Sequence, residues 1–176
     1  MTAHENGLVQ YALRLATALD QAVIREMLYQ SLYVPEGELA VSREILDDPK
    51  LSRYAADWGR PGDVGILAEA GDEVLGAAWC RLFRQDAPGY GFISSEIPEM
   101  GLAVAPQRRG RGIGTALLNA LIAEVQNPKA GRTTCTRPGA LSLSVMRGNP
   151  VIRLYQRCGF RVISESEVAF VMRLDF

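Results

Sequence analysis

The residues best suited to chemistry lie in one short stretch in the middle of the chain, where three arginines and three glycines crowd together. The stretch runs from Gln107 to Thr115 and reads QRRGRGIGT. Glycine permits main-chain turns and close approaches that a Cβ prevents, and arginine adds positive charge. If a helix starts here, its first backbone N–H groups lack intrahelical partners and lie at the positive end of the helix dipole. The stretch therefore predicts a cradle for an anion such as a pyrophosphate.

Two common phosphate-binding motifs do not fit this stretch. A nucleoside-triphosphate P-loop needs lysine and then serine or threonine after its last glycine, but Gly114 is followed by Thr115 and Ala116. A dinucleotide fingerprint needs Gly-x-Gly-x-x-Gly, and counting from Gly110 and Gly112 the third position falls on Thr115. The motif alone leaves one alternative open, an ordinary strand-to-helix turn with solvated arginines.

The elements on either side of the turn can be predicted from their periodicity. Before it, Met100, Leu102 and Val104 alternate with small or polar residues, which is typical of a strand that ends at Pro106. After it, apolar residues recur with the spacing of one helix face, at Ile113, Leu117, Leu118, Leu121, Ile122 and Val125. The turn therefore connects the end of a strand to the start of a helix.

The length and composition indicate one globular domain, residues 1–176. The chain has 48% hydrophobic and 22% charged residues, and its 19 basic side chains are balanced by 20 acidic ones. This balance argues against a nucleic-acid partner or an anionic membrane surface. The positive charge of the arginine-rich turn is therefore local.

Cysteine usage and hydropathy exclude several further classes. Cys80, Cys135 and Cys158 are widely spaced, and His4 is the only histidine, so neither a disulfide framework nor a metal site is expected. The sequence contains no basic segment leading into an apolar run at its start and no stretch of about 18 apolar residues. We expect a cytoplasmic protein without a membrane segment.

The rest of the chain alternates between strand and helix patterns. Residues 74–82 are apolar at nearly every position, which predicts a strand covered by helices on both faces of its sheet. The predicted order is strand, two helices, three strands, helix, strand, helix and two strands. The strands are predicted at 11–15, 64–69, 73–83, 99–105, 140–145, 161–164 and 169–174. The helices are predicted after Thr17 or Asp20, at 42–54 with a break at Pro49, from Ile113 onward, and from Asn149 to Gly159.

Residues 84–95 are predicted to form a loop, because Pro88, Gly89 and Gly91 interrupt any periodicity. Tyr90 and Phe92 lie in this loop, just before the central strand. They either form part of a substrate-binding wall or cover an open edge of the sheet, and the sequence favours neither.

A second motif lies near the C-terminus, where residues 149–160 read NPVIRLYQRCGF. Together with QRRGRG, it resembles the pattern of the GNAT superfamily, the acyl-CoA-dependent N-acetyltransferases, whose motifs are Gln/Arg-x-x-Gly-x-Gly/Ala and Asn-x-x-x-x-Leu-Tyr-x-x-x-Gly-Phe. The resemblance covers almost the whole chain. It implies an α/β (α+β) fold with a splayed mixed sheet, helices on both faces, and acetyl-CoA as co-substrate in the opening.

The resemblance also implies which residues bind acetyl-CoA. Main-chain groups around Leu102, Ala103 and Val104 would bind the pantetheine arm and the acyl carbonyl. Asn149 would reach the pantetheine portion. The N–H groups of the turn would hold the pyrophosphate, with binding residues Arg109, Gly110, Arg111, Gly112, Ile113, Gly114 and Thr115.

The reaction that the family performs needs a base and an acid. An alkylammonium with a pKa near 10 is mostly protonated at neutral pH, so a group must accept its proton. Glu99 is the candidate base, because the family often places a glutamate at the start of the central strand. The first alternative is that Glu99 is only a solvent-facing carboxylate at the strand end, and the second is that Glu96 acts as the base. Ser142 and Ser144 on the next strand are not bases at neutral pH. Tyr155 is the candidate acid for the departing thiolate; the alternative is that its ring only packs on the apolar helix face, and the two roles can coexist.

These observations predict an N-acetyltransferase that transfers the acetyl group by direct attack to a primary amine of a small molecule, amino acid or peptide. The sequence does not name the acceptor. A non-catalytic acyl-CoA-binding regulatory module of the same fold is the alternative, and a nucleic-acid-binding protein is disfavoured by the charge balance. A homodimer is compatible with the family, many of whose members dimerise.

Overall fold

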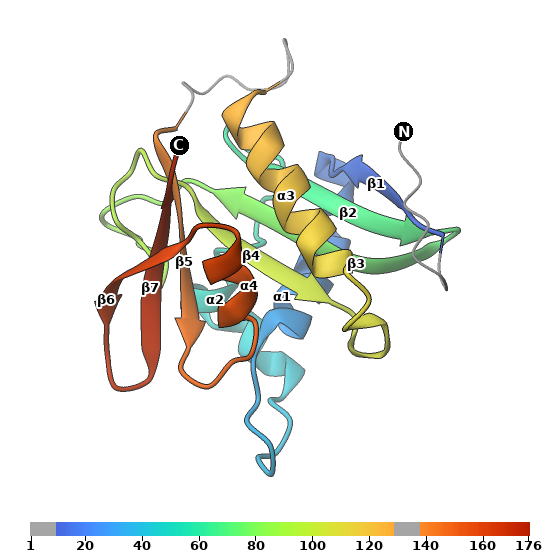
Figure 1. Cartoon of the computed structure of the whole chain (residues 1–176), viewed down its shortest axis with the longest axis horizontal. Coiled ribbons are helices and arrows are strands. Elements are labelled where there is room, and N and C mark those ends of the chain that lie inside the picture. The colour runs from blue at the N-terminus through green and yellow to red at the C-terminus, as the bar shows by residue number, and fades with distance from the viewer. Residues whose placement is uncertain (1–9, 129–137) are drawn as a thin grey trace.

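The computed structural model describes residues 10–128 and 138–176, and its elements follow the predicted order (Figure 1). The strands are β1 (Ala12–Leu15), β2 (Val64–Ala70), β3 (Glu73–Arg81), β4 (Glu99–Val104), β5 (Ala140–Met146), β6 (Arg161–Glu165) and β7 (Ala169–Asp175). The helices are α1 (Gln21–Ser31), α2 (Pro49–Ser52), α3 (Ile113–Gln126) and α4 (Ile152–Arg157), with short 3-10 helices at Ala18–Asp20, Arg43–Asp47 and Pro106–Arg108.

The break expected at Pro49 is present. The predicted helix at 42–54 is divided into a 3-10 helix and α2, because proline has no N–H to continue the first segment but fits the first turn of the second. Asp48 caps α2, its Oδ1 accepting a hydrogen bond of 2.7 Å from the N–H of Lys50.

The seven strands form one mixed sheet in the order β1-β2-β3-β4-β5-β7-β6. All neighbouring pairs are antiparallel except β4 and β5, which are parallel and share a single register pair, Glu99 with Ser142. The N–H of Ser142 donates to the carbonyl of Pro98 at 3.0 Å. Beyond this point the two strands separate toward their carboxyl ends, which confirms the predicted splayed sheet.

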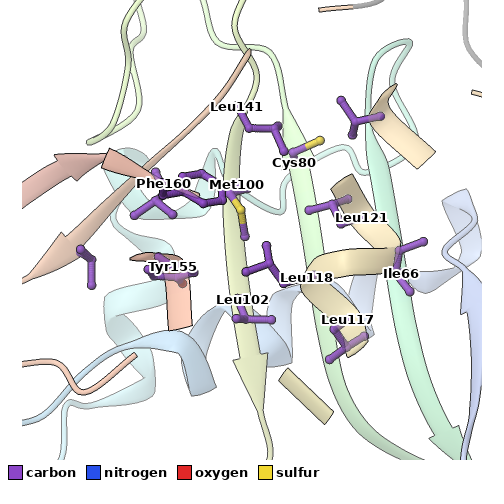
Figure 2. Packing of buried hydrophobic residues seen from close by; sticks show 14 of the residues in the cluster. Ile66, Cys80, Met100, Leu102, Leu117, Leu118, Leu121, Leu141, Tyr155 and Phe160 are labelled. Carbon is purple, nitrogen blue, oxygen red and sulfur yellow. The ribbon is translucent and has the colours of Figure 1, made fainter. Parts of the chain in front are cut away.

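Helices cover both faces of the sheet, α3 and α4 on one side and α1 and α2 on the other (Figure 1). Along β4, Met100 and Leu102 belong to the apolar core under α3 and α4, whereas Ala103 belongs to the second core under α1 and α2. Figure 2 shows this first core, in which β4 is flanked by Leu117 and Leu118 of α3 and by Tyr155 of α4.

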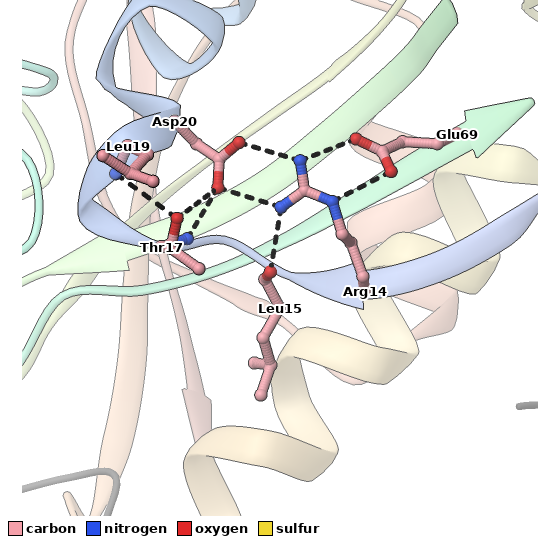
Figure 3. Close-up of polar contacts among 6 residues, drawn as sticks. All are labelled: Arg14, Leu15, Thr17, Leu19, Asp20 and Glu69. Atoms are coloured by element: carbon pink, nitrogen blue, oxygen red, sulfur yellow. Dashed lines mark hydrogen bonds and ion pairs between the residues drawn. The ribbon is translucent and has the colours of Figure 1, made fainter. Parts of the chain in front are cut away.

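A polar cluster joins the first strand to the start of α1 (Figure 3). The Arg14 guanidinium binds Asp20 at 2.8 Å and Glu69 at 2.7 Å, so that β1, β2 and the approach to α1 are linked. Thr17 caps the 3-10 helix, and the Asp20 carboxylate accepts a hydrogen bond from the Thr17 N–H in return, forming a capping box. The helix start predicted at Thr17 or Asp20 thus uses both residues.

Candidate active site

Glu99 lies where β4 and β5 part, and its carboxylate is buried on the α1 and α2 side of the sheet. The residue is only 2% exposed, so the alternative of a solvent-facing carboxylate is wrong. Oε1 accepts hydrogen bonds from the Tyr54 hydroxyl at 2.6 Å and from the Gly91 N–H at 2.8 Å. Burial raises the Glu99 pKa to about 7, because the two donors only partly offset the loss of solvation. A carboxylate with this pKa is suited to accept and release a proton near neutral pH.

The second oxygen of this carboxylate has a different environment. Glu99 Oε2 is buried and makes no hydrogen bond within the described part of the chain. It faces Gly89, where an added Cβ would lie 2.1 Å from Oε2 and 2.7 Å from the Tyr54 oxygen. A side chain at residue 89 would therefore displace the carboxylate, and Oε2 is the oxygen with capacity to accept a proton.

Tyr54 is a site residue that the sequence analysis did not predict. Its hydroxyl donates to Glu99 and accepts a hydrogen bond of 2.6 Å from the N–H of Tyr90. Burial, followed by the nearby Glu99 charge, raises the pKa of this phenol above its ordinary value, so it stays protonated as a donor. Tyr54 lies 45 residues before Glu99 in the sequence, and no local motif connects the two.

A buried ion pair holds the segment that carries Tyr54. The Arg81 guanidinium, on β3 beside Glu99 in the strand register, binds both oxygens of Asp63 and is fully buried. It also donates to the main-chain carbonyls of Arg53 at 2.6 Å and Ala56 at 2.8 Å. A bidentate pair with further hydrogen bonds satisfies a guanidinium away from water. Arg81 therefore fixes the main chain on both sides of Tyr54 against the sheet.

The loop that precedes β4 closes over Glu99. Gly91 packs so tightly on β5 that an added Cβ would lie 2.5 Å from the Leu143 carbonyl carbon. Phe92 packs against the second core, while Tyr90 is 57% exposed as a residue and its ring stacks on the Tyr54 ring with centroids 6.2 Å apart. Phe92 therefore packs as part of the second core, whereas Tyr90 presents an exposed aromatic ring beside Tyr54, the hydrogen-bond partner of Glu99.

Main-chain groups of β4 face the opening between β4 and β5. The N–H of Ala105 bonds to the Leu75 carbonyl, and because antiparallel pairing alternates, Ala103 also directs its N–H and carbonyl toward β3. The main chains of Leu102 and Val104 point the other way, into the opening. Of the three residues predicted to contact acetyl-CoA through their main chains, Leu102 and Val104 direct main-chain groups into the opening. The main-chain groups of Ala103 instead face β3.

The glycine-rich turn has the geometry that a cradle requires. Gly110 and Gly112 have φ angles of 74° and 80°, in the left-handed region that glycine adopts without strain, and an added Cβ at either would meet no atom within 4 Å. Gly112 is the N-cap of α3, so the first N–H groups of this helix point out of the turn. Ile113 is buried, whereas Thr115 is exposed.

The three arginines of the turn have different roles in the fold. Arg108 pairs with Glu73 at 2.6 Å. Arg109 donates to the carbonyls of Val104 at 3.0 Å and Gln30 at 3.3 Å, so it joins the end of β4 to the end of α1. Arg111 is exposed. Of the three side chains, that of Arg111 is the best placed to meet an anion from solution.

Asn149 and Tyr155 lie on the other side of the opening. Asn149 starts the turn into α4, its Oδ1 accepting a hydrogen bond of 3.0 Å from the Val151 N–H, which leaves its amide N–H groups as donors. Tyr155 is buried, and its ring packs on Phe160 with centroids 5.8 Å apart. Burial raises the Tyr155 pKa above its ordinary value, so the phenol carries its proton at neutral pH. Ring packing and proton donation are compatible in this position.

The family of the chain follows from comparison with known proteins. The model of the acetyltransferase (GNAT) family matches residues 24–160, from α1 to the end of the second motif. The chain belongs to the GNAT family. This result confirms the resemblance found in the two motifs.

One relative of this GNAT protein has low sequence identity to it and matches only part of the chain. Mycothiol acetyltransferase of Propionibacterium freudenreichii is 28% identical over 114 residues, which cover 64% of this chain. The chain spans only about a third of that relative's length, since the match covers 32% of it.

Solved structures with the same fold align over nearly the whole GNAT chain. The putative acetyltransferase yncA of Salmonella typhimurium, solved with acetyl-CoA, is 22% identical with a TM-score of 0.63 and covers 94% of this chain and 93% of its own. The PaiA N-acetyltransferase of Thermoplasma acidophilum, solved with coenzyme A, is 19% identical with a TM-score of 0.60 and covers 94% and 99%.

Other predicted features of this GNAT protein concern cysteines, metals and membranes. Cys80 is buried in the first core, which raises its pKa to about 12, and burial also raises the pKa of Cys158. His4 and Cys135 lie outside the described residues. Within residues 10–128 and 138–176, no group of three or more potential metal ligands occurs. No helix in this part of the chain is long and apolar enough to cross a bilayer.

Proposed function

We propose that this protein transfers the acetyl group of acetyl-CoA directly to a primary amine of a small molecule, amino acid or peptide. The observation that carries the proposal is the buried Glu99 carboxylate, with a pKa raised to about 7, at the point where β4 and β5 separate. A protein that only bound acyl-CoA would have no need of a buried carboxylate there, since burying a charge costs free energy.

In this mechanism the ammonium group of the acceptor first gives a proton to Glu99 Oε2, directly or through water, and the neutral amine nitrogen then attacks the thioester carbonyl carbon. The N–H groups of Leu102 and Val104 face the opening and supply donors for the developing oxyanion. The bond between carbon and sulfur then breaks, and the Tyr155 hydroxyl gives its proton to the departing thiolate. The nitrogen of the new amide loses its remaining extra proton to the Tyr155 oxygen, and Glu99 releases its proton to solvent, so that protons and electron pairs balance.

Direct attack is favoured over a covalent enzyme intermediate by the two described cysteines. A nucleophilic cysteine works as the thiolate, which a lowered pKa promotes. Burial instead raises the pKa of Cys80 to about 12 and also raises that of Cys158. Neither thiol is suited to accept an acetyl group at neutral pH.

The acetyl-CoA part of the proposal assigns the turn from Arg109 to Thr115 to the pyrophosphate, and Leu102, Val104 and Asn149 to the pantetheine arm. Thermal unfolding with acetyl-CoA titrated in tests it. At a hundred times its dissociation constant a ligand stabilises a fold by about 2.7 kcal/mol, which for this size raises Tm by about 5–10 °C.

Gly112→Asp places a carboxylate in the turn and should abolish the shift, because the anion would meet a negative charge at the helix start. Gly37→Asp is the matched control, since Gly37 has a similar φ of 87° and equally open surroundings, away from the turn. A wild-type protein without a shift, or a Gly112→Asp protein that shifts as wild type does, would contradict the assignment. A shift without turnover on any amine would favour the non-catalytic acyl-CoA-binding module.

A further inference from the structure

A pocket lies between α2 and the loop that precedes β4, outside the residues assigned above to acetyl-CoA. Its volume is about 330 Å³, which suits part or all of a small molecule. It is lined by Lys50, Arg53, Asp86, Pro88, Gly89 and Tyr90.

The charges that line this pocket do not cancel. Asp86 is already bound by Arg84 through two hydrogen bonds of 2.8 and 2.9 Å, so its negative charge is offset. Lys50 and Arg53 have no carboxylate within 4.0 Å among residues 10–128 and 138–176. The pocket therefore presents two uncompensated positive charges, which favour an anionic group.

Arg53 is held in a fixed position at the pocket. Its Nε donates to the Pro49 carbonyl at 2.9 Å, and its Nη1 donates to the Pro88 carbonyl at 2.7 Å. These bonds join α2 to the loop and leave Nη2 as a donor. A guanidinium fixed in this way loses less conformational entropy on binding an anion than a free side chain would.

The pocket shares a wall with the proposed base. Gly89 lines the pocket and also lies against Glu99 Oε2, and Tyr90 lines the pocket while its N–H donates to the Tyr54 hydroxyl. Because residue 89 has no side chain, a single stretch of main chain separates the pocket from the carboxylate. A ligand held here would therefore lie on the far side of the residue 89 main chain from the Glu99 carboxylate.

We propose that the acceptor is a small amine that also carries a carboxylate or phosphate, and that Lys50 and Arg53 bind this anionic group while the amine is directed past Gly89 toward Glu99. The acceptor role rests on the proposed acetyl transfer, whereas binding of an anionic amine in the pocket does not.

Calorimetric titration of the protein saturated with CoA tests this proposal without turnover. The probes are matched pairs that differ in the anionic group: phosphoethanolamine with ethanolamine, and glutamate with its diamide. We expect at least one anionic probe to bind about tenfold tighter than its partner without the anionic group, with a preference that weakens as salt is raised. The two pairs distinguish phosphate from carboxylate. Equal binding within both pairs would overturn the proposal.

Variants connect the preference to this pocket. Lys50→Met should reduce the preference about threefold to tenfold, and it leaves the α2 cap intact because Asp48 binds the main chain of Lys50. Arg60→Met is the matched control, since Arg60 is also exposed but does not line the pocket. Equal effects of the two variants would contradict the assignment of the anion to Lys50.

The same samples distinguish failure of this proposal from failure of the acetyl-transfer proposal. If acetyl-CoA raises Tm but no anionic preference depends on Lys50, the pocket assignment is wrong and acetyl-CoA binding stands. If the preference depends on Lys50 but acetyl-CoA gives no shift, the anion pocket stands and the acceptor role falls.

Discussion

On the α3 and α4 side of β4, the groups assigned to acetyl-CoA come from β4 with the turn after it and from the start of α4, stretches that each carry a continuous motif. On the α1 and α2 side, the Glu99 carboxylate meets Tyr54 and Gly91, and the Arg81 pair that holds this arrangement involves two further segments. The first side depends on local backbone geometry. The second depends on side-chain contacts between residues far apart in the sequence.

This difference fits the ligand that we propose for each side. A turn with main-chain N–H groups can bind any pyrophosphate, so the same short motif serves many proteins. An acceptor site has to suit one molecule, and loops and first helices can change without disturbing the turn. The two sides meet at Glu99, which is why changes near this residue separate their contributions best.

The largest effect is expected from Glu99→Gln. Removing the base should lower the rate with the best acceptor from an amine panel by about 10²–10⁴ at neutral pH. In the wild type the rate should rise as pH passes through about 7 from below, because only the deprotonated carboxylate accepts a proton. The variant should lose this dependence while acetyl-CoA raises its Tm as in wild type.

Glu96→Gln is the control for this prediction, since Glu96 is an exposed carboxylate in the loop just before β4. It should leave both the rate and the pH profile unchanged. A Glu99→Gln protein with the wild-type pH profile would remove Glu99 from the mechanism.

A smaller effect is expected from Tyr54→Phe. The Tyr54 hydrogen bond lowers the Glu99 pKa, so its loss should move the rising limb of the pH–rate profile to higher pH. The Tyr90 N–H also loses its acceptor, and the free energy of unfolding should fall by about 1–3 kcal/mol in denaturant titrations.

Tyr29→Phe provides the comparison, because the Tyr29 hydroxyl also makes one hydrogen bond, of 2.7 Å to the Val41 carbonyl, in another part of the same core. It should cost a similar free energy and leave the pH profile in place. If both variants gave the same profile, Tyr54 would have a structural role only.

Much of the first side could be predicted from the sequence, because its signals are local. The position of β4 and the start of α3 follow from periodicity, glycine and proline, which act on neighbouring residues. The helix predicted from Asn149 begins instead at Ile152, with Asn149 capping the turn before it. Cap residues define a helix end only to within a turn.

The second side could not be predicted in the same way. The pairing of Tyr54 with Glu99 spans 45 residues, and the tyrosine stands in a segment without strong periodicity. One signal was present, since Arg81 ends an apolar strand and a buried arginine requires a partner such as Asp63. That signal indicates a buried ion pair, but it does not identify the hydroxyl that the pair positions.

The smallest effect is expected at Ser142, the register partner of Glu99 across the parallel pair. Its Oγ is buried and makes no hydrogen bond within the described chain, which is an unfavourable state for a hydroxyl. Ser142→Ala should therefore leave the free energy of unfolding unchanged or raise it by up to about 1 kcal/mol, and leave the pH profile unaltered. Ser144→Ala, on the same strand but half-buried, should change stability by less than about 0.5 kcal/mol. If Ser142→Ala instead lowered the free energy of unfolding by more than about 1 kcal/mol, or moved the pH profile, the Ser142 hydroxyl would have a partner beside Glu99 in solution. The proposed proton-accepting site would then include side chains of both β4 and β5.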